Sequence, residues 1–483
     1  MIRAALALAL LAPVPALAQP AAAPLTLDEV LRSSARAAPL TLDEVLRSSA
    51  RAAPQIIEAL AKIRSAEGRA LTAEGAFDTV FEAEGKSRAL GYYDGTVVSG
   101  RATRPMGDNG GYLYGNYRVT RGDFPVYEDE FYTNRLGEVK VGALYSLMRD
   151  RLVDERRTRR TLAGGDIDIA RFEREATAIG VQRRAVDAYQ NWVAAGQRLR
   201  AYRDLLDLSE RRRGGIARQI ELGARPDILL TENDQNLVRR RGLVVKAEGD
   251  FQAAANALSL YYRDAAGNPL LVGAERLPGD SNALVGPRVV APVGDVAQRR
   301  PDLQMLLTRV DQGLAKLALA ENDLRPRLDL RGEMGKDIGP VGLGGSSRTP
   351  LEAAVGFRFS IPLQNRAARG KVSEAEAEID ALNARGRFVR DQIAVEVEGI
   401  LIGVGAAERL AAVAEQERAL AERLADAERR RFELGSSDFF LVNQREETAN
   451  DARVRLIDAQ ARIAAARAEL AAATADRAAL GLE

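Results

Sequence analysis

Two very long stretches of helical character constrain the fold of this chain more than any other feature. Residues 149–222 and 366–434 are rich in alanine, arginine and glutamate, and they end at related turns, "ELGARPD" and "ELGSSDF". A helix of about 70 residues is about 105 Å long, a length that no compact domain needs. The sustained apolar spacing predicts side-by-side packing of the helices as coiled coils. The helices alone are equally typical of a soluble rod.

The two stretches belong to two halves with the same order of elements. In the first half we expect a helix, two strands and two helices at residues 41–75, 77–88, 138–148, 149–222 and 227–262. In the second half the same series is expected at residues 293–323, 327–334, 352–361, 366–434 and 438–479. The first half is 35 residues longer between matching landmarks, and the gap between its strands is 34 residues longer. One longer loop, residues 91–137, therefore accounts for almost the whole difference between two helix–strand–strand–helix–helix repeats.

Charged and apolar side chains alternate along the expected strands. The charged positions are Glu82, Glu84, Lys86, Arg88, Arg327, Asp329, Arg331, Glu333 and Arg358. Such alternation is typical of a transmembrane barrel, whose charged positions face the water-filled lumen, and equally of a half-exposed soluble sheet. Four strands cannot close, since small barrels need about eight, and lipid does not tolerate open sheet edges. A membrane barrel would therefore need three chains, which give twelve strands at four per chain.

The tyrosines favour the barrel. Eight of the twelve lie in residues 92–145, within or beside the first pair of expected strands. Aromatic residues gather where a membrane protein meets the bilayer interface, although an adhesive soluble loop would concentrate them in the same way.

Composition excludes several classes of protein. The opening MIRAALALALLAPVPALA has one positive charge, an apolar run and a small-residue end, which predicts a secretory signal peptide over residues 1–18. Its removal takes one of 69 basic residues and none of 68 acidic residues, so the remaining charges balance and do not favour nucleic acid. The sequence has no histidine and no cysteine, so we expect no enzyme, metal site, cofactor, disulfide or cysteine lipid anchor. After residue 18, no apolar stretch approaches the roughly 18 residues of a membrane helix.

A short segment near the N-terminus is duplicated. Residues 24–38, PLTLDEVLRSSARAA, recur letter for letter as residues 39–53. Only the second copy adjoins Pro54, and its Thr41 and Glu44 form the capping-box signature of a helix start. Pro39 opposes a continuous helix through both copies. We therefore expect the fold to use the second copy and the first to be a spare segment.

These observations divide the chain into five parts. They are the signal peptide 1–18, an N-terminal extension 19–38 with the duplicated segment, a first repeat 39–262, a Gly- and Pro-rich linker 263–292, and a second repeat 293–483.

Four motifs occur in a characteristic order: LTLDEVL before Ala53-Pro54, RRPDL at 299–303, FRFSIPLQNRAARGKVSEAEAEI at 357–379 and the paired ELG turns. Through these motifs the chain resembles the TolC-type outer-membrane efflux proteins, the outer-membrane factors. The resemblance covers essentially the whole chain after the signal peptide, through the order and spacing of the motifs rather than through one specific motif.

The resemblance implies a mainly α-helical homotrimer in the lipid of the cell outer membrane, with a twelve-stranded β-barrel continued by a long α-helical barrel into the periplasm. It implies an exit duct of a tripartite efflux or type I secretion system, without cofactors and without nucleic acid. An inner-membrane pump of RND or ABC type and a periplasmic adaptor protein would be its partners. The family's adaptor-contacting tip turns match Leu222, Gly223, Ala224, Leu434, Gly435 and Ser436.

Family members often close the tip with rings of aspartates just beyond the turns, but Leu441 and Gln444 occupy two regular positions here. Asp227 and Asp438 become the candidate aperture acids, because three copies of an acid near the axis would select cations. Each follows a turn directly, where an aspartate also serves as an ordinary helix N-cap. The alternative function is a periplasmic coiled-coil adaptor or scaffold. Two hairpins and two amphipathic strand pairs favour the duct, since an adaptor typically carries one hairpin with lipoyl-like and small β-barrel segments.

Overall fold

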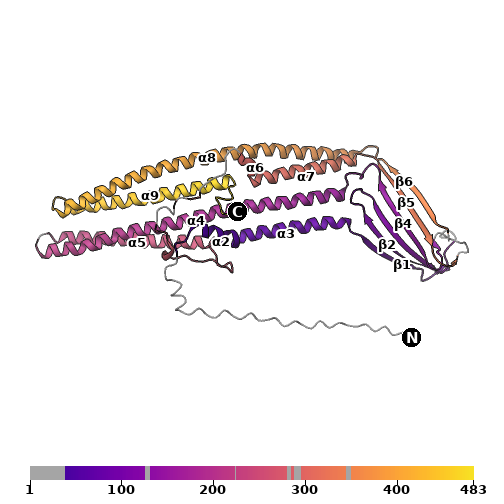
Figure 1. Ribbon diagram of the computed structural model, residues 1–483, viewed down its shortest axis with the longest axis horizontal. Coiled ribbons are helices and arrows are strands. Elements are labelled where there is room, and N and C mark those ends of the chain that lie inside the picture. Colours follow the sequence, from indigo (N-terminus) through magenta and orange to yellow (C-terminus); the bar gives the residue numbers. More distant parts are fainter. Residues whose placement is uncertain are drawn as a thin grey trace, which may run out of the picture.

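A computed structural model describes residues 38–125, 131–223, 225–279, 284, 286–287, 295–343 and 350–482. The molecule is elongated, with an antiparallel sheet at one end of a bundle of long helices and the tips of two helical hairpins at the other (Figure 1). The predicted signal peptide, the first copy of the duplicated segment except Ala38, and the predicted tip residue Ala224 lie outside the described residues.

The predicted elements occur in the predicted order, but the first helix of each half is divided before Pro54 and Pro301, and the first half has two further strands. The first half contains α2 (Leu42–Ala52), α3 (Pro54–Glu74), the 3₁₀ turn η1 (Gly75–Phe77), β1 (Val80–Ser87), β2 (Thr96–Pro105), β3 (Tyr112–Arg121), β4 (Glu138–Ser146), α4 (Glu155–Glu221) and α5 (Ile228–Ser259). After the 3₁₀ turn η3 (Ala274–Arg276), the second half contains α6 (Val296–Arg299), α7 (Pro301–Asp323), β5 (Arg327–Asp337), β6 (Glu352–Ser360), α8 (Arg366–Glu433) and α9 (Phe439–Ala473). Pro54 and Pro301 begin α3 and α7, where the missing amide costs no helical hydrogen bond.

Corresponding helices of the two halves have nearly equal lengths. The long helices α4 and α8 have 67 and 68 residues, and the helices after them have 32 and 35. The helices that lead into the sheet have 21 and 23 residues. These lengths agree with the duplication that the sequence predicts.

The first half departs from its predicted plan between residues 91 and 137. Its described residues contain the hairpin of β2 and β3, so the segment is not one long loop, and the sheet that the described residues form has six strands rather than four. The sequence-based prediction of four strands per chain, and hence of twelve in a trimer, is therefore wrong in the number of strands per chain. Apolar and charged residues alternate less strictly in the two missed strands, while Asn109-Gly110 between them is a typical hairpin-turn sequence.

All six strands are antiparallel to their neighbours, in the order β1-β2-β3-β4-β5-β6. The pairing of β4 with β5 joins the two halves, for example through Val141 opposite Met334. Strands β1 and β6 form the two edges of the sheet.

The long helices α4 and α8 organise the bundle. Helix α4 packs against α3 toward the sheet and against α5 toward the tips, and α8 packs in the same way against α7 and α9 (Figure 1). Contacts of α4 with α7 and α9 join the two halves. Each half is therefore one long helix covered by two shorter ones placed in succession along it.

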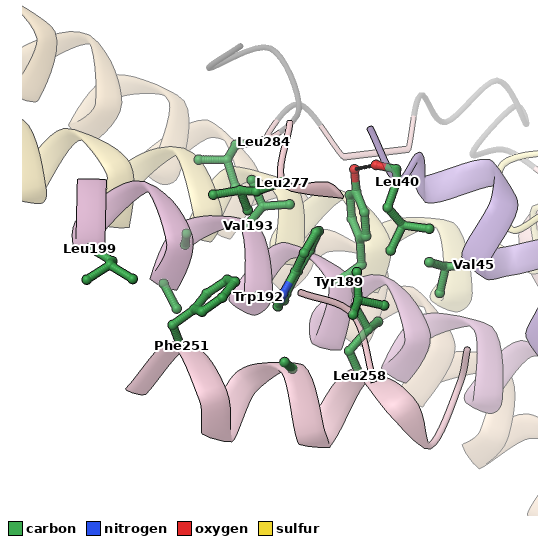
Figure 2. Packing of buried hydrophobic residues seen from close by; sticks show 14 of the residues in the cluster. Leu40, Val45, Tyr189, Trp192, Val193, Leu199, Phe251, Leu258, Leu277 and Leu284 are labelled. Carbon is green, nitrogen blue, oxygen red and sulfur yellow. Dashed lines mark hydrogen bonds between the residues drawn. The ribbon is translucent and has the colours of Figure 1, made fainter. Parts of the chain in front are cut away.

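The main hydrophobic core lies in the middle of the bundle and centres on Trp192 of α4 (Figure 2). The Trp192 ring has no exposed surface and stacks on Phe251 of α5, with ring centroids 6.0 Å apart. Leu277 of the predicted linker 263–292 packs on this core, and a Cβ at Gly196 would lie 2.4 Å from its Cδ2. The linker therefore covers part of the core as well as joining the repeats.

The second copy of the duplicated segment forms α2, as predicted. The Thr41 hydroxyl accepts a hydrogen bond from the Glu44 amide at 3.2 Å, which caps the helix. The Glu44 carboxylate accepts hydrogen bonds from Arg276 at 2.8 Å and Tyr262 Oη at 2.6 Å. Val45 is fully buried in the core. The cap and the burial together show that the second copy is part of the fold.

Candidate functional site

The strand register separates charged from apolar side chains on the two faces of the sheet. Residues that pair across antiparallel strands point to the same face. One row of partners is Glu82, Arg101, Asn116, Lys140, Gly335 and Glu352. The adjacent row, on the other face, is Phe81, Ala102, Gly115, Val141, Met334 and Ala353. We call these the charged face and the apolar face. The alternation predicted for four strands continues through β2 and β3.

The predicted lumen-facing residues share the charged face. In β1, β5 and β6 these are Glu82, Glu84, Lys86, Arg327, Asp329, Arg331, Glu333 and Arg358. Arg88 follows the end of β1 and, together with Glu84 and Lys86, lines a hollow on this face. Asp329 differs from the others because only 2% of it is exposed. Its carboxylate accepts hydrogen bonds from Ser146 at 3.0 Å and Arg327 at 2.7 Å, so it joins β4 to β5.

Polar and charged side chains pair on this face, both within single strands and between strands. Tyr114 donates a hydrogen bond to Glu333 at 2.6 Å, and Arg331 lies 2.8 Å from the same carboxylate. Arg118 and Lys140 both pair with Glu138, at 2.9 and 3.1 Å. These groups line a hollow of about 420 Å³. The face is therefore polar and of mixed charge rather than strongly basic or acidic.

The apolar face is exposed over most of its extent. Phe81 is 71% exposed, Val141 54%, Val355 80% and Phe357 79%. A contiguous exposed apolar surface marks a site that a partner or a membrane covers. The half-exposed soluble sheet considered above would bury this face in the protein core, which the structure does not do.

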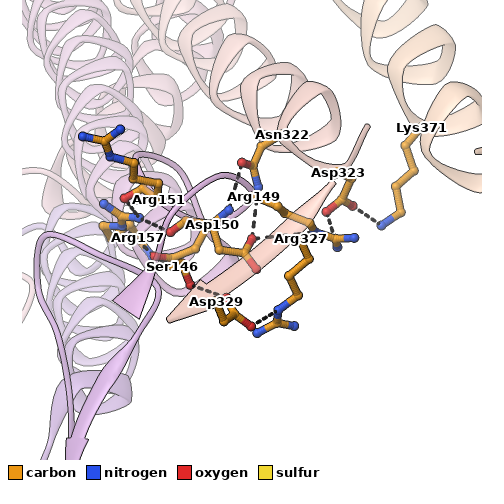
Figure 3. A network of polar contacts seen from close by, with 11 residues as sticks. Ser146, Arg149, Asp150, Arg151, Arg157, Asn322, Asp323, Arg327, Asp329 and Lys371 are labelled. Atoms are coloured by element: carbon orange, nitrogen blue, oxygen red, sulfur yellow. Dashed lines mark hydrogen bonds and ion pairs between the residues drawn. The ribbon is translucent and has the colours of Figure 1, made fainter. Parts of the chain in front are cut away.

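A polar network joins the sheet to the helical bundle (Figure 3). Arg149 lies 2.6 Å from Asp323 at the end of α7, and Lys371 of α8 lies 3.0 Å from the same carboxylate. Asp150 and Asn322 exchange two hydrogen bonds of 3.0 Å. The network ties the segment between β4 and α4 to α7 and α8, so it fixes the sheet relative to these two helices.

The turn of the β2–β3 hairpin is anchored in the same junction. Asn109 donates a hydrogen bond to the Ser146 carbonyl and accepts one from the Ser146 amide, each at 2.9 Å. The Gly110 amide donates to the Asp150 carbonyl at 2.9 Å, and a Cβ on Gly110 would lie 2.7 Å from that residue. Arg157 of α4 donates to the Asp108 carbonyl at 2.8 Å. The hairpin is therefore an integral part of the sheet.

The predicted tip turns lie at the end of the molecule opposite the sheet (Figure 1). Leu222 has φ −83° and ψ 3°, and Leu434 has φ −81° and ψ 1°. Gly223 and Gly435 follow with φ 70° and 76°, the left-handed conformation that glycine adopts without strain. Both leucines are exposed, at 69% and 82%. Ser436 donates from its amide and its hydroxyl to the Arg431 carbonyl, at 2.8 and 3.0 Å.

The two candidate aperture acids have different local roles. Asp438 accepts a hydrogen bond from the Leu441 amide at 2.6 Å and is the N-cap of α9. Asp227 precedes α5 with helical φ and ψ and makes no side-chain capping bond. The ordinary capping interpretation therefore holds for Asp438 and not for Asp227.

A buried ionic cluster near the tips was missed by the sequence analysis. Glu446 of α9 and Arg240 of α5 are each 1% exposed, with side chains 3.4 Å apart. Glu446 also pairs with Arg212 of α4 and, at 3.3 Å, with Arg429 of α8. Burial lowers the pKa of the Arg240 guanidinium, and the charge of Glu446 opposes that shift. No pattern in the sequence distinguishes these residues from the many exposed arginines and glutamates of the same helices.

The charged residues of β2 and β3, such as Arg101 and Arg118, were missed with their strands. The alternation of Tyr112, Tyr114, Asn116 and Arg118 was the available signal. Among the described residues, no group of three or more histidine, cysteine, aspartate or glutamate side chains is placed to hold a metal ion. Within the described part of the chain, no helix combines the length and the apolar character needed to cross a bilayer.

Comparison with known proteins identifies the second repeat. Residues 293–476 match the model of the family described as outer membrane efflux protein. Through these residues, the second repeat is similar to the outer membrane efflux proteins. The resemblance inferred from the motifs is thus confirmed. No curated protein sequence matches the chain.

Several solved structures of outer membrane proteins share the fold. They include the CmeC outer membrane channel of Campylobacter jejuni, with a TM-score of 0.59 at 14% identity over 90% of this chain and 85% of that one. The outer membrane protein VceC of Vibrio cholerae has a TM-score of 0.60 at 16% identity, over 92% of this chain and 97% of that one. The MtrE outer membrane channel of Neisseria gonorrhoeae, in its open state, has a TM-score of 0.61 at 14% identity, over 90% and 88%. CmeC and MtrE are both outer membrane channels.

Proposed function

We propose that this protein is the exit duct of a tripartite efflux or type I secretion system. The observation that carries the proposal is the sheet with one charged and one exposed apolar face, placed at one end of a long helical bundle. This arrangement suits a sheet with water on one side and lipid on the other. The family match of residues 293–476 supports the same function.

Three copies of the chain would form the duct. The sheets would close into a β-barrel in the outer membrane, because lipid does not tolerate open sheet edges. The bundles of α3, α4, α5, α7, α8 and α9 would lie side by side as a helical barrel that extends into the periplasm. The charged face would line the lumen, and the apolar face would contact outer-membrane lipid.

The hairpin tips would contact a periplasmic adaptor protein, which in turn would join an inner-membrane pump of RND or ABC type. Leu222 and Leu434 support this role, because both are exposed at the far end of the molecule and a neighbouring residue, Phe440, is 73% exposed. Exposed apolar side chains at a tip are typical of a protein contact surface. The tips also touch each other, with the Arg225 guanidinium 4.9 Å from the Phe432 ring centroid.

Near the tips, Asp227 and Asp438 would face the axis and favour cations. Asp227 is the stronger candidate, since its carboxylate has no capping role.

Cell fractionation and gel electrophoresis test the proposal. We expect the protein in the outer-membrane fraction and, on a gel, a trimer that dissociates on heating. Purified protein in a planar bilayer should then form ion-conducting pores. A soluble periplasmic monomer without pore activity would contradict the duct and favour the alternative, a periplasmic coiled-coil adaptor or scaffold.

A further inference from the structure

The two edge strands of the sheet are open. Every residue of β1 and β6 is exposed, and no described strand pairs with the outer side of either. Such edges present unpaired backbone groups that bind another strand. Strand β1 leaves the helical bundle and β6 returns to it (Figure 1), so β6 of one copy can pair with β1 of the next in the antiparallel sense used throughout the sheet.

The faces of the two edges restrict how they can pair. The apolar face holds Phe81 and Ala83 on β1 and Phe357 and Phe359 on β6. A shift of one residue would place every side chain of one strand on the wrong face. Even-numbered residues of β1 must therefore lie opposite even-numbered residues of β6.

The register within the sheet shows how far the strands are offset. Starting at Val80, successive partners are Thr103, Tyr114, Gly142, Glu333 and Ala354. Strand β6 nevertheless continues from Ala354 to Ser360 before it returns to the bundle, six residues farther along. Since β1 begins and β6 ends at the bundle, alignment of these two ends at the same level requires an offset of six residues per copy.

We propose that three copies close this sheet into a barrel of eighteen strands, with Val80 of one copy opposite Ser360 of the next. The proposal rests on the function proposed above and goes beyond it in the number of strands and the register. The three offsets of six residues add up to a barrel shear of eighteen, which equals the number of strands. That ratio also holds in an eight-stranded barrel of shear eight, whose strands tilt by about 36°, within the usual range of about 35–45°.

The same register brings complementary side chains together at the subunit boundary. Glu82 lies opposite Arg358 of the neighbouring copy on the charged face, and Phe81 lies opposite Phe359 on the apolar face. Glu82 and Arg358 are both exposed and form no ion pair with another described residue. Opposite charges and aromatic pairs stabilise directly opposed strand positions.

The added hairpin changes the shape of the duct. Barrel diameter grows with strand number, so eighteen strands give a lumen about one and a half times as wide as twelve, in the range of porins with an aqueous channel. Only β1, β4, β5 and β6 connect to helices, so β2 and β3 widen the sheet without adding helices to the bundle. The outer opening of the barrel is therefore wider than the helical part of the duct. The helical part alone then limits the size of the solutes that pass.

Cysteine cross-linking tests the register in the full-length protein, which has no native cysteine. The double variant Glu84→Cys/Gly356→Cys places thiols at opposed positions and leaves the Glu82–Arg358 pair intact. An added Cβ at Gly356 meets no atom within 4 Å. With a short thiol cross-linker we expect a ladder of covalent species that ends at three copies on a denaturing gel. Each single-cysteine variant should give no covalent species of three copies.

The matched control is Glu84→Cys/Glu352→Cys, whose thiols lie on the same face but about 13 Å out of register. It should not cross-link. An outer-membrane oligomer that cross-links at the control pair, at neither pair, or to a number other than three would overturn this inference while leaving the duct intact. A soluble monomer would overturn the proposed function itself, so the two failures are distinguishable.

Discussion

Tyr189 illustrates how one side chain joins distant segments of the chain at the residue scale. It is 2% exposed on α4, and its hydroxyl donates a hydrogen bond of 2.8 Å to the Leu40 carbonyl before α2 (Figure 2). Burial, with a contribution from the negative charge of Glu44, raises the pKa of Tyr189 to about 12.

This shift predicts a specific loss of stability at alkaline pH. Because the folded pKa lies above the ordinary value near 10, the neutral phenol stabilises the fold fully below pH 10, and this contribution is lost as pH rises toward 12. Two pKa units correspond to about 2.7 kcal/mol. Tyr189→Phe should lower the free energy of unfolding by about 1 kcal/mol at pH 7 and remove this part of the alkaline loss. Thermal unfolding followed by circular dichroism between pH 7 and 11 measures both effects.

The control is Tyr92→Phe, because Tyr92 is 93% exposed. It should leave the alkaline slope unchanged. An equal slope in wild type and Tyr189→Phe would show that the buried phenol does not contribute.

Asp227 and Asp438 give a second prediction at the residue scale. Asparagine removes the charge but remains a good N-cap, so Asp438→Asn separates the charge of the residue from its capping bond. If both acids line the aperture, Asp227→Asn and Asp438→Asn should raise single-channel conductance or reduce cation preference in a planar bilayer. Unchanged conductance and selectivity in both variants would exclude them as aperture residues.

At the scale of elements, the buried cluster around Glu446 joins four helices. Its partners Arg212, Arg240 and Arg429 come from α4, α5 and α8, while Glu446 belongs to α9. A buried ion pair loses stability strongly when one partner is removed, because the other charge remains buried and unpaired.

Glu446→Gln should therefore lower the free energy of unfolding by about 3–5 kcal/mol. Glu417→Gln is the matched control, since its pair with Arg455 also joins α8 to α9 but is 47% and 50% exposed. We expect the control to cost less than about 1 kcal/mol. Denaturant unfolding of both variants measures the difference, and equal costs would show that the buried cluster has no special role.

The elements also show where sequence patterns suffice. The ends of α8 were predicted within one residue, because helical periodicity over 68 residues leaves little ambiguity. Strands β2 and β3 were missed, because apolar and charged residues alternate less strictly in them: Val97 lies on the charged face and Arg104 on the apolar face. Their pairing with β1 and β4 stabilises them, and no local window of sequence contains that information.

At the scale of the whole molecule, the duplicated N-terminal segment has a simple test. Deletion of residues 24–38 and deletion of residues 39–53 give the same protein, because the two copies are identical. Either deletion preserves an Ala-Pro step before Leu40. We therefore expect the shortened protein to form α2 and to assemble normally.

Deletion of both copies, residues 24–53, is the contrasting variant. It removes Leu40, Val45 and Leu46, which are at most 4% exposed in the core. We expect a loss of oligomer on unheated gels and less protein in the outer-membrane fraction. Loss of assembly after deletion of a single copy would show instead that both copies are structural.

The sequence by itself determined the properties that repeat locally: the long helices, the two faces of the expected strands and the glycine turns at the tips. Residues a few positions apart specify each of these, so periodicity and turn chemistry were sufficient. Only the tertiary structure decided the number of strands, the burial of Asp329 and the pairing of Arg240 with Glu446, which are 206 residues apart in the chain. These features depend on which distant segments become neighbours, and burial, rather than residue type, then separates a structural charge from an exposed one.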